Sequence, residues 1–384
     1  MARDYQIISG DSHLEVRADR WTHRVPAAYQ DVAPRMMTLD DGADAIIVPG
    51  GKPAHNPMDL YGGKGRDEWR PYGERYEDTP GTGSPEQRVG EMDLDGVDAE
   101  VLYPSVNCGA TVWEQIPDPE AQKAVFHAYN AWLAEEYCAA APDRLFGVGT
   151  IPRTGLDDAL AELRYAKDAG LKAVVLRAFP TGRSKPSLED DAFWQAALDM
   201  SMPVTIHVTM AGIQAVPGGL VDFPREADIA LHTDLAHQLS RFGRGGASNV
   251  VQLILSGVFD RFPALHINMS ENQIGWVPLF METGDIRYGR HIGWTAELQG
   301  YTPLSRPFSE YVREHFYWGF QQDTSGVELR HHMGVDRLIW GSDFPHVESE
   351  WPHSKQVLEA NFAKIPADET SRMLCGNARE FFGI

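Results

Sequence analysis

Short apolar runs of strand length recur along the whole chain, and most are separated by longer segments with helical features. Eight runs predict strands at residues 6–10, 100–104, 146–152, 172–177, 203–208, 265–271, 316–320 and 337–341. Helical patterns occupy residues 119–141, 157–169, 190–200 and 368–382. This alternation of strand and helix predicts a parallel sheet covered by helices.

Capping residues support the predicted helix ends. Asp118 is the expected N-cap of the first helix, Pro119 suits its first position, and Pro142 ends it. Gly170 is the expected stop of the second helix, and Ser187 lies in the N-cap region of the third. Eight strands with intervening helices are typical of a (β/α)8 TIM barrel, and a doubly wound open sheet is the structural alternative.

Residues 21–86 interrupt the alternation. This stretch is rich in glycine, proline and charge and has no clear period. In a barrel it would be a long insertion after the first strand, at the catalytic face, where long loops are often functional. We expect a cap that selects the substrate. A peripheral or oligomer-forming insert is the alternative.

Composition narrows the class of protein. With 384 residues, of which 43% are hydrophobic, residues 1–384 suit a single barrel domain with an insertion. No apolar stretch approaches the length of a membrane span, and no signal peptide is visible. The net charge of −21 argues against binding to nucleic acid. Three scattered cysteines argue against a disulfide framework, so we expect a cytoplasmic protein acting on a small molecule.

The first and last apolar runs each stop at a carboxylate and a histidine. Asp11 and His13 follow the first run, and Asp343 and His346 follow the last. Residues two apart on a strand point the same way, so Asp11 and His13 share a face. The first and last strands of a closed barrel are neighbours, and carboxylates with imidazoles suit zinc, manganese or iron.

Other strand ends add polar side chains to the same rim. His207 ends the fifth run and on its own would be more typical of a core histidine. Glu271 could bind a second metal, act as an acid or base, or pair with Arg177. Arg177 could clamp a substrate carboxylate, or form a buried salt bridge with Glu271 or Asp343. Taken together, these strand ends favour a metal site.

Two further groups of residues are candidates for the same site. His346 could relay protons or orient a ligand, and Glu15 could support it. Trp318 and Phe344, with the aromatic residues Trp69, Tyr72 and Tyr76 of the insertion, could form an apolar wall against the substrate. Ordinary packing is the alternative for these aromatic residues.

Seven motifs carry a family resemblance along most of the chain. They are D-S-H-L-E at 11–15, M-D-L-D-G-V-D at 92–98, H-A-Y-N-A-W-L at 127–133, R-L-F-G-V-G-T-I-P at 144–152, F-D-R-F-P-A-L at 259–265, S-E-N-Q-I-G-W-V-P at 270–278 and W-G-S-D-F-P-H at 340–346. The chain resembles the amidohydrolase superfamily, specifically the amidohydrolase-related group that includes aminocarboxymuconate-semialdehyde decarboxylase-like proteins. The last motif is the most specific, and the insertion is covered only weakly.

The resemblance implies a distorted (β/α)8 barrel of the metallo-dependent hydrolase type, with Asp11, His13, His207 and Asp343 as metal ligands. Asp343 would also handle the proton of the metal-bound water. Decarboxylases of this group commonly have a histidine where this chain has Glu271. The lysine that bridges two metals in many relatives is absent from the end of the fourth strand, where Arg177 stands. The resemblance therefore implies a single divalent metal, with zinc ahead of manganese or iron, and Glu271 could help to hold a second.

The leading functional hypothesis is an enzyme that cleaves a small anionic aromatic or polyketide-like substrate with metal-activated water. Asp343, Glu271 and His346 would be catalytic, and Arg177 and Trp318 would bind the substrate. Non-oxidative decarboxylation of a hydroxy-aromatic or muconate-type acid is the first alternative. A dinuclear non-haem iron oxygenase and a non-enzymatic binding protein are more distant ones. We also expect a homo-oligomer, in the simplest case a dimer.

Overall fold

The computed structural model describes residues 3–67, 69–210, 235, 239 and 244–384. Within it, eight parallel strands form one sheet in the order β1-β4-β5-β6-β7-β8-β9-β10. Their bounds are β1 Ile8–Leu14, β4 Ala99–Pro104, β5 Leu145–Thr150, β6 Ala173–Val175, β7 Val204–His207, β8 Ile267–Ser270, β9 Phe316–Phe320 and β10 Leu338–Trp340. All eight predicted strands are confirmed.

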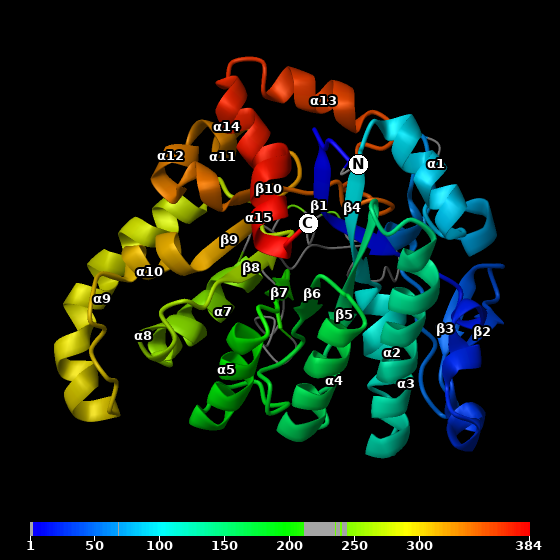
Figure 1. Cartoon of the computed structure of the whole chain (residues 1–384), viewed down its shortest axis with the longest axis horizontal. Coiled ribbons are helices and arrows are strands. Elements are labelled where there is room, and N and C mark those ends of the chain that lie inside the picture. The colour runs from blue at the N-terminus through cyan, green and yellow to red at the C-terminus, as the bar shows by residue number, and fades with distance from the viewer. Residues whose placement is uncertain (1–2, 68, 211–234, 236–238, 240–243) are drawn as a thin grey trace.

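Helices follow most of these strands and surround the sheet (Figure 1). Their bounds are α1 Pro85–Asp95, α2 Thr111–Trp113, α3 Pro119–Trp132, α4 Leu156–Asp168, α5 Asp191–Asp199, α7 Arg244–Leu255, α8 Val258–Arg261, α9 Val277–Gln299, α10 Phe308–His315, α11 Thr324–Glu328, α12 Arg330–Met333, α13 Ser354–Asn361, α14 Ala367–Ser371 and α15 Asn377–Phe382. None of the helices in the described residues is long and apolar enough to cross a membrane.

The barrel closes where β1 meets β10. The backbone N–H of Asp343 donates to the carbonyl of Asp11 at 2.8 Å, and the N–H of His13 donates to the carbonyl of Phe344 at 2.8 Å. Two glycines permit this approach: a Cβ on Gly341 would lie 2.5 Å from the Cβ of Asp11, and one on Gly10 would lie 2.2 Å from a methyl of Ile339. The arrangement is a (β/α)8 barrel, and the open-sheet alternative is wrong.

Two hydrophobic layers hold the barrel together. Alternate residues of the strands, such as Val101, Val148, Val175 and Tyr317, form one cluster with Phe382 of α15, and this cluster fills the barrel interior. The other residues of the strands form a larger cluster with the surrounding helices. Which face of a strand a residue occupies therefore decides whether it can reach the barrel axis.

Local capping explains the predicted helix ends. The Asp118 side chain accepts a hydrogen bond from the N–H of Glu120, and Pro119 stands at the first position of α3. Ser187 and Asp190 form a capping box ahead of α5. Gly170 follows α4 with a φ of 84°, a conformation that favours glycine.

The insertion at residues 21–86 contains elements that its sequence did not predict. Two antiparallel strands, β2 Arg35–Thr38 and β3 Asp44–Ile47, form a small separate sheet at the right of Figure 1. A short 3₁₀ helix, Pro57–Leu60, lies beside the loop after β10, where the N–H of Val347 donates to the carbonyl of Met58 at 2.9 Å. Part of the insertion thus reaches the end of the barrel that carries the strand C-termini.

Candidate metal centre and active site

Four buried side chains from three strand ends converge at this end of the barrel. Asp11 and His13 lie on β1, His207 ends β7 and Asp343 follows β10, and their ligand atoms lie within 4.8 Å of one another. His13 Nε2 is 3.2 Å from Asp343 Oδ1, and His207 Nε2 is 3.5 Å from Asp11 Oδ1. The structure brings together all four residues that the sequence grouped as metal ligands.

Buried polar atoms of this group lack hydrogen bonds. Both carboxylate oxygens of Asp11 and of Asp343, both ring nitrogens of His13, and Nε2 of His207 have no hydrogen-bond partner within the described part of the chain. Each such atom costs about 1–3 kcal/mol when it is buried without a partner. A divalent cation could coordinate one atom of each of the four side chains, and two carboxylates with two imidazoles suit zinc, manganese or iron.

Electrostatics within the group also favour a cation. Burial raises the pKa of Asp11 above its usual value despite the nearby His207. Burial, followed by repulsion from His346, lowers the pKa of His13 well below its usual value and keeps this imidazole neutral. Burial opposes the charging of His207, but the attraction of Asp11 outweighs it and raises the pKa of His207. Metal binding would displace that proton.

Glu271 lies beside the four ligands. Its Oε2 is 3.4 Å from His207 Nε2, just beyond the end of β8. Glu271 and Asp343 have φ values of 53° and 57°, and Val208 and Gln273 have φ values of 53°. Positive φ at non-glycine residues is strained backbone, which clusters at functional sites. Three strand ends of this barrel therefore hold such strained backbone around one point.

His346 connects Asp343 of the metal site to Glu15, a carboxylate outside the four-residue set. Its Nδ1 is 3.2 Å from Asp343 Oδ1 and its Nε2 is 3.2 Å from Glu15 Oε1, while its ring stacks on His13 at 4.0 Å. Burial lowers the pKa of His346, but Asp343 and Asp59 attract its charge and raise that pKa well above its usual value. His346 is thus a charged histidine held between two carboxylates.

Asp59 is a neighbour that the sequence did not reveal. It accepts hydrogen bonds from the amides of Asn56 at 2.6 Å and Asn107 at 3.0 Å, and it is only 5% exposed. Burial raises its pKa to about 7. Asp59 sits in the insertion, which has no periodicity from which its burial could be predicted.

Arg177 has a different partner from those we expected. Its Nε donates to Glu114 Oε1 at 2.9 Å and its Nη2 donates to Thr111 Oγ1 at 3.0 Å. The expected salt bridge with Glu271 or Asp343 is therefore wrong for the described structure, because Glu114 is the nearby carboxylate. Arg177 still lines a cavity of about 20 Å³ together with Tyr103 and His207.

The aromatic wall is only partly as expected. Trp318 belongs to the cluster between barrel and helices and packs edge-on against Trp276 at 5.5 Å, so its proposed contact with substrate is wrong. Tyr76 is buried and Tyr72 is 69% exposed. Trp69 does face a hollow, beside Tyr61 at 5.3 Å.

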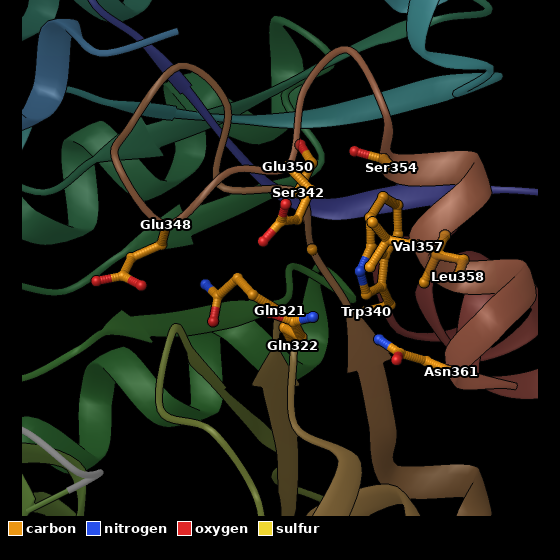
Figure 2. Close-up of a pocket in the computed structure, with 11 residues that line it drawn as sticks. Gln321, Gln322, Trp340, Ser342, Glu348, Glu350, Ser354, Val357, Leu358 and Asn361 are labelled. Atoms are coloured by element: carbon orange, nitrogen blue, oxygen red, sulfur yellow. The ribbon is translucent and has the colours of Figure 1, made fainter. Parts of the chain in front are cut away.

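This hollow of about 570 Å³ lies over the strand ends. It is lined by Met58, Tyr61, Arg66 and Trp69 of the insertion, by Gln273, Gln321, Gln322, Val347, Glu348 and Glu350 after β8, β9 and β10, and by Leu235 and Leu239. Its size falls in the range of about 300–1,000 Å³ typical of small-molecule sites. A smaller cavity of about 20 Å³ between β9, β10 and α13 shares Gln321, Gln322, Glu348 and Glu350 with it (Figure 2).

Comparisons with known proteins agree with this architecture. The chain is 26% identical over 317 residues to a gamma-resorcylate decarboxylase of Polaromonas sp., which covers 78% of this chain and 87% of the relative. The solved structure of amidohydrolase map2389c from Mycobacterium avium subsp. paratuberculosis has a TM-score of 0.75 and 22% identity, with 100% and 99% of the two chains covered.

A second solved structure contains a metal. It is a 5-carboxyvanillate decarboxylase of Novosphingobium aromaticivorans with manganese and 4-hydroxy-3-methoxy-5-nitrobenzoic acid, with a TM-score of 0.70, 16% identity, and 99% and 96% of the two chains covered. The chain is thus an enzyme of the carboxy-lyase or hydrolase type, with a buried Asp/His site suited to a divalent metal. The sequence profile of the family described as Amidohydrolase matches residues 18–384, so this protein belongs to that family.

Proposed function

We propose that this protein is a divalent-metal-dependent decarboxylase of a hydroxyaromatic acid. The observation that carries the proposal is the buried set of Asp11, His13, His207 and Asp343, whose unpaired atoms face one another. The match to a gamma-resorcylate decarboxylase favours decarboxylation over the hydrolysis that we first expected. The oxygenase alternative has no support among these relatives.

Manganese is the metal that we propose to test first, with zinc second. A solved structure of the same fold holds manganese, whereas the sequence alone placed zinc ahead. Two carboxylates and two imidazoles bind either ion. Bound between these four side chains, the ion would orient the substrate carboxylate and a neighbouring hydroxyl and would withdraw charge from the ring.

The side chains have separate roles in this reaction. The bond between the ring carbon and the carboxylate breaks, its electron pair stays on the ring carbon, and a proton must be added there as carbon dioxide leaves. Asp343 and the charged His346 are the pair that would deliver that proton. Glu271 would position His207, and Arg177 would place positive charge beside the substrate.

The hollow over the strand ends supports the choice of an aromatic acid. Met58, Tyr61, Trp69 and Val347 supply apolar contacts, and the carboxamides of the lining glutamines supply uncharged hydrogen-bonding groups. Because Met58, Tyr61 and Trp69 come from the insertion, we propose that residues 21–86 form the cap that selects the substrate.

Product analysis tests this function. The purified chain, loaded with Mn²⁺, is incubated with 2,6-dihydroxybenzoate, 2,4-dihydroxybenzoate and 5-carboxyvanillate. We expect at least one acid to release carbon dioxide in a 1:1 ratio with the decarboxylated arene, without consumption of oxygen. A metal-loaded chain that releases no carbon dioxide but hydrolyses esters or amides of such acids would return hydrolysis to first place.

We further propose a homodimer formed through α9. Leu279, Ile286, Trp294 and Leu298 are 64%, 45%, 46% and 75% exposed and recur at helical spacing along this helix. In Figure 1, α9 extends away from the barrel at the left. An exposed apolar stripe of this length is typical of an interface. A cytoplasmic location remains a prediction, consistent with three free, buried cysteines.

A further inference from the structure

A buried arginine of helix α1 contacts the backbone at two of the three strand ends that carry the proposed metal ligands, those of β1 and β10. Arg88 is 1% exposed, and its Nη1 donates to the carbonyl of His13 at 3.0 Å. Its Nη2 donates to the carbonyl of Phe344, the residue after Asp343, at 3.1 Å. The guanidinium also lies 4.5 Å from the centre of the Phe344 ring. One side chain therefore connects the backbone at the β1 ligand His13 with the backbone next to the β10 ligand Asp343.

The fixed plane of the guanidinium makes this connection rigid. Its donors project in a fork of fixed geometry, so two carbonyls bonded to Nη1 and Nη2 are held at a set separation. The remaining donor, Nε, is held by Glu100 Oε2 at 2.6 Å, and Glu100 on β4 is 2% exposed. Each of the three nitrogens of the Arg88 guanidinium thus donates a hydrogen bond.

Glu100 extends the network to residues between the ligands. Its Oε1 accepts from the hydroxyl of Ser12 at 3.3 Å, and Ser12 lies between Asp11 and His13. The Ser12 hydroxyl is 2.9 Å from that of Ser342, the residue before Asp343. The ends of β1 and β10 are therefore each held twice, once through a carbonyl bonded to Arg88 and once through a serine hydroxyl linked to Glu100.

We propose that Arg88, together with Glu100, is a positioning residue of the metal centre, which fixes the distance between the Asp11/His13 pair and Asp343. This inference rests on the metal centre of the proposed function but not on the reaction catalysed there. Groups that orient metal ligands typically contribute a factor of about 10–100 to metal affinity. Arg88 itself touches neither metal ligand side chains nor substrate, so its effect would pass through the backbone.

The chain offers a matched control at the other end of the barrel. Arg144 is 6% exposed, donates to the carbonyls of Asp98 and Val97 at 2.9 and 3.0 Å, and pairs with Asp93 at 2.6 Å. Like Arg88, it bonds one carboxylate and two carbonyls, although Arg88 also donates from Nη1 to the carbonyl of Gly81 at 3.2 Å. Arg144 precedes β5, and its side chain bonds none of the described segments that carry a ligand. Loss of Arg144 measures what such an arginine contributes to stability alone.

The test measures two quantities for each variant and for the wild type. They are the Mn²⁺ affinity, from titration calorimetry of the metal-free protein, and the Tm. Arg88→Met should weaken Mn²⁺ binding 10- to 100-fold, and Arg88→Lys should lie between it and the wild type, because lysine cannot bond both carbonyls in one plane. Arg144→Met should lower Tm and leave the affinity within about twofold of the wild type.

Arg88→Met leaves Glu100 buried without its cation, which can prevent folding. The double variant Arg88→Met/Glu100→Met removes both charges and keeps the volume, and it should fold yet still bind Mn²⁺ at least 10-fold more weakly. Wild-type affinity in the double variant, with only a lower Tm, would overturn the proposal. A wild-type chain that binds neither Mn²⁺ nor Zn²⁺ would overturn both the positioning role of Arg88 and the proposed metal centre. Absence of decarboxylation with normal Mn²⁺ binding would affect the proposed function alone.

Discussion

Individual residues at the site are arranged at the expense of stability. Asp11, His13 and Asp343 are almost fully buried, yet their polar atoms lack hydrogen bonds within the described residues. Positive φ at Glu271 and Asp343 adds backbone strain. Such costs persist when a ligand offsets them, so the free energy of folding and the affinity for metal are linked at this point.

Loss of a single ligand should separate metal binding from folding. His207→Ala removes one of four ligand atoms, so we expect the Mn²⁺ affinity to fall on the order of 100-fold or more, since even supporting groups contribute 10- to 100-fold. The circular dichroism spectrum should stay unchanged. Metal content is measured by elemental analysis after dialysis.

The matched control for this variant is His332→Ala, at an exposed position of α12. It should retain wild-type metal content. Equal metal content in His207→Ala and His332→Ala would remove His207 from the metal centre.

Asp59 should make stability depend on pH. Burial raises its pKa to about 7, above the usual value of a carboxyl group in the unfolded chain. The folded chain therefore binds one more proton than the unfolded chain between about pH 4 and 7, and stability from this group falls as pH rises through that window, by at most ~1.4 kcal/mol per unit. Above about pH 7, Asp59 is ionised in both the folded and the unfolded chain, so its contribution to stability no longer changes with pH.

Asp59→Asn should remove this slope. The amide oxygen can still accept from Asn56 or Asn107, but the side chain cannot ionise. Urea unfolding at pH 5 and pH 8 should show the variant gaining stability over the wild type at the higher pH. Asp67→Asn, at an exposed position of the same insertion, should differ little from the wild type at either pH. A stability difference for Asp59→Asn that is the same at both pH values would contradict the assigned pKa.

At the scale of elements, the seam between β1 and β10 is the critical contact. Gly10 and Gly341 let the two strands approach, and the Asp11 carbonyl accepts a hydrogen bond from the Asp343 N–H across them. The seam thus closes the barrel and brings the ligands from opposite ends of the chain together. Crowding it should disturb both stability and metal binding.

Gly341→Ala tests the seam. The added Cβ would lie 2.5 Å from the Cβ of Asp11, so one strand must shift, and such overpacking typically costs about 1–3 kcal/mol. We expect a lower Tm and weaker Mn²⁺ binding. In Gly90→Ala the new methyl meets nothing within 4 Å of the described structure and lies on exposed α1, so this control should raise the Tm slightly. A Gly341→Ala variant as stable as the wild type would show that the strands tolerate a wider seam.

The barrel strands were predictable because their signals are local. Buried parallel strands are continuous apolar runs, and several of them end at or just before a charged residue or a histidine at the catalytic rim. The face of Trp318 was not predictable, because β9 is aromatic at four of its five positions and alternation is invisible. The β2–β3 hairpin was missed because its two strands are only four residues long and have no alternating pattern, although Asp41-Gly42 between them is a turn signal.

The site was predictable only where it coincides with strand ends. Asp11, His13, His207, Glu271 and Asp343 all follow that rule, and the structure brings them together. Asp59 and the Glu114 partner of Arg177 lie in loops and short helical turns, whose three-dimensional contacts depend on the whole fold. Arg88 looked like an ordinary helical arginine, because nothing local in α1 shows that its side chain reaches the β1–β10 seam.

At the scale of the whole molecule, we expect assembly through α9. Light scattering coupled to size-exclusion chromatography should give twice the chain mass of 42.7 kDa. Trp294→Glu/Leu298→Glu places two charges in the exposed apolar stripe and should give the monomer mass. Leu188→Glu, at a 72% exposed position away from α9, should remain dimeric. A monomeric wild-type chain would contradict the proposed dimer.

The ligands of this metal centre come from both ends of the polypeptide, Asp11 and His13 from the first barrel strand and Asp343 from just after the last. All four donors are therefore available only after the ribosome has released the segment that contains Asp343, and a nascent product halted before β10 could supply only three of them. Once bound, the ion would link β1 to the segment after β10, and the free energy of unfolding of the closed barrel would increase with the concentration of free metal.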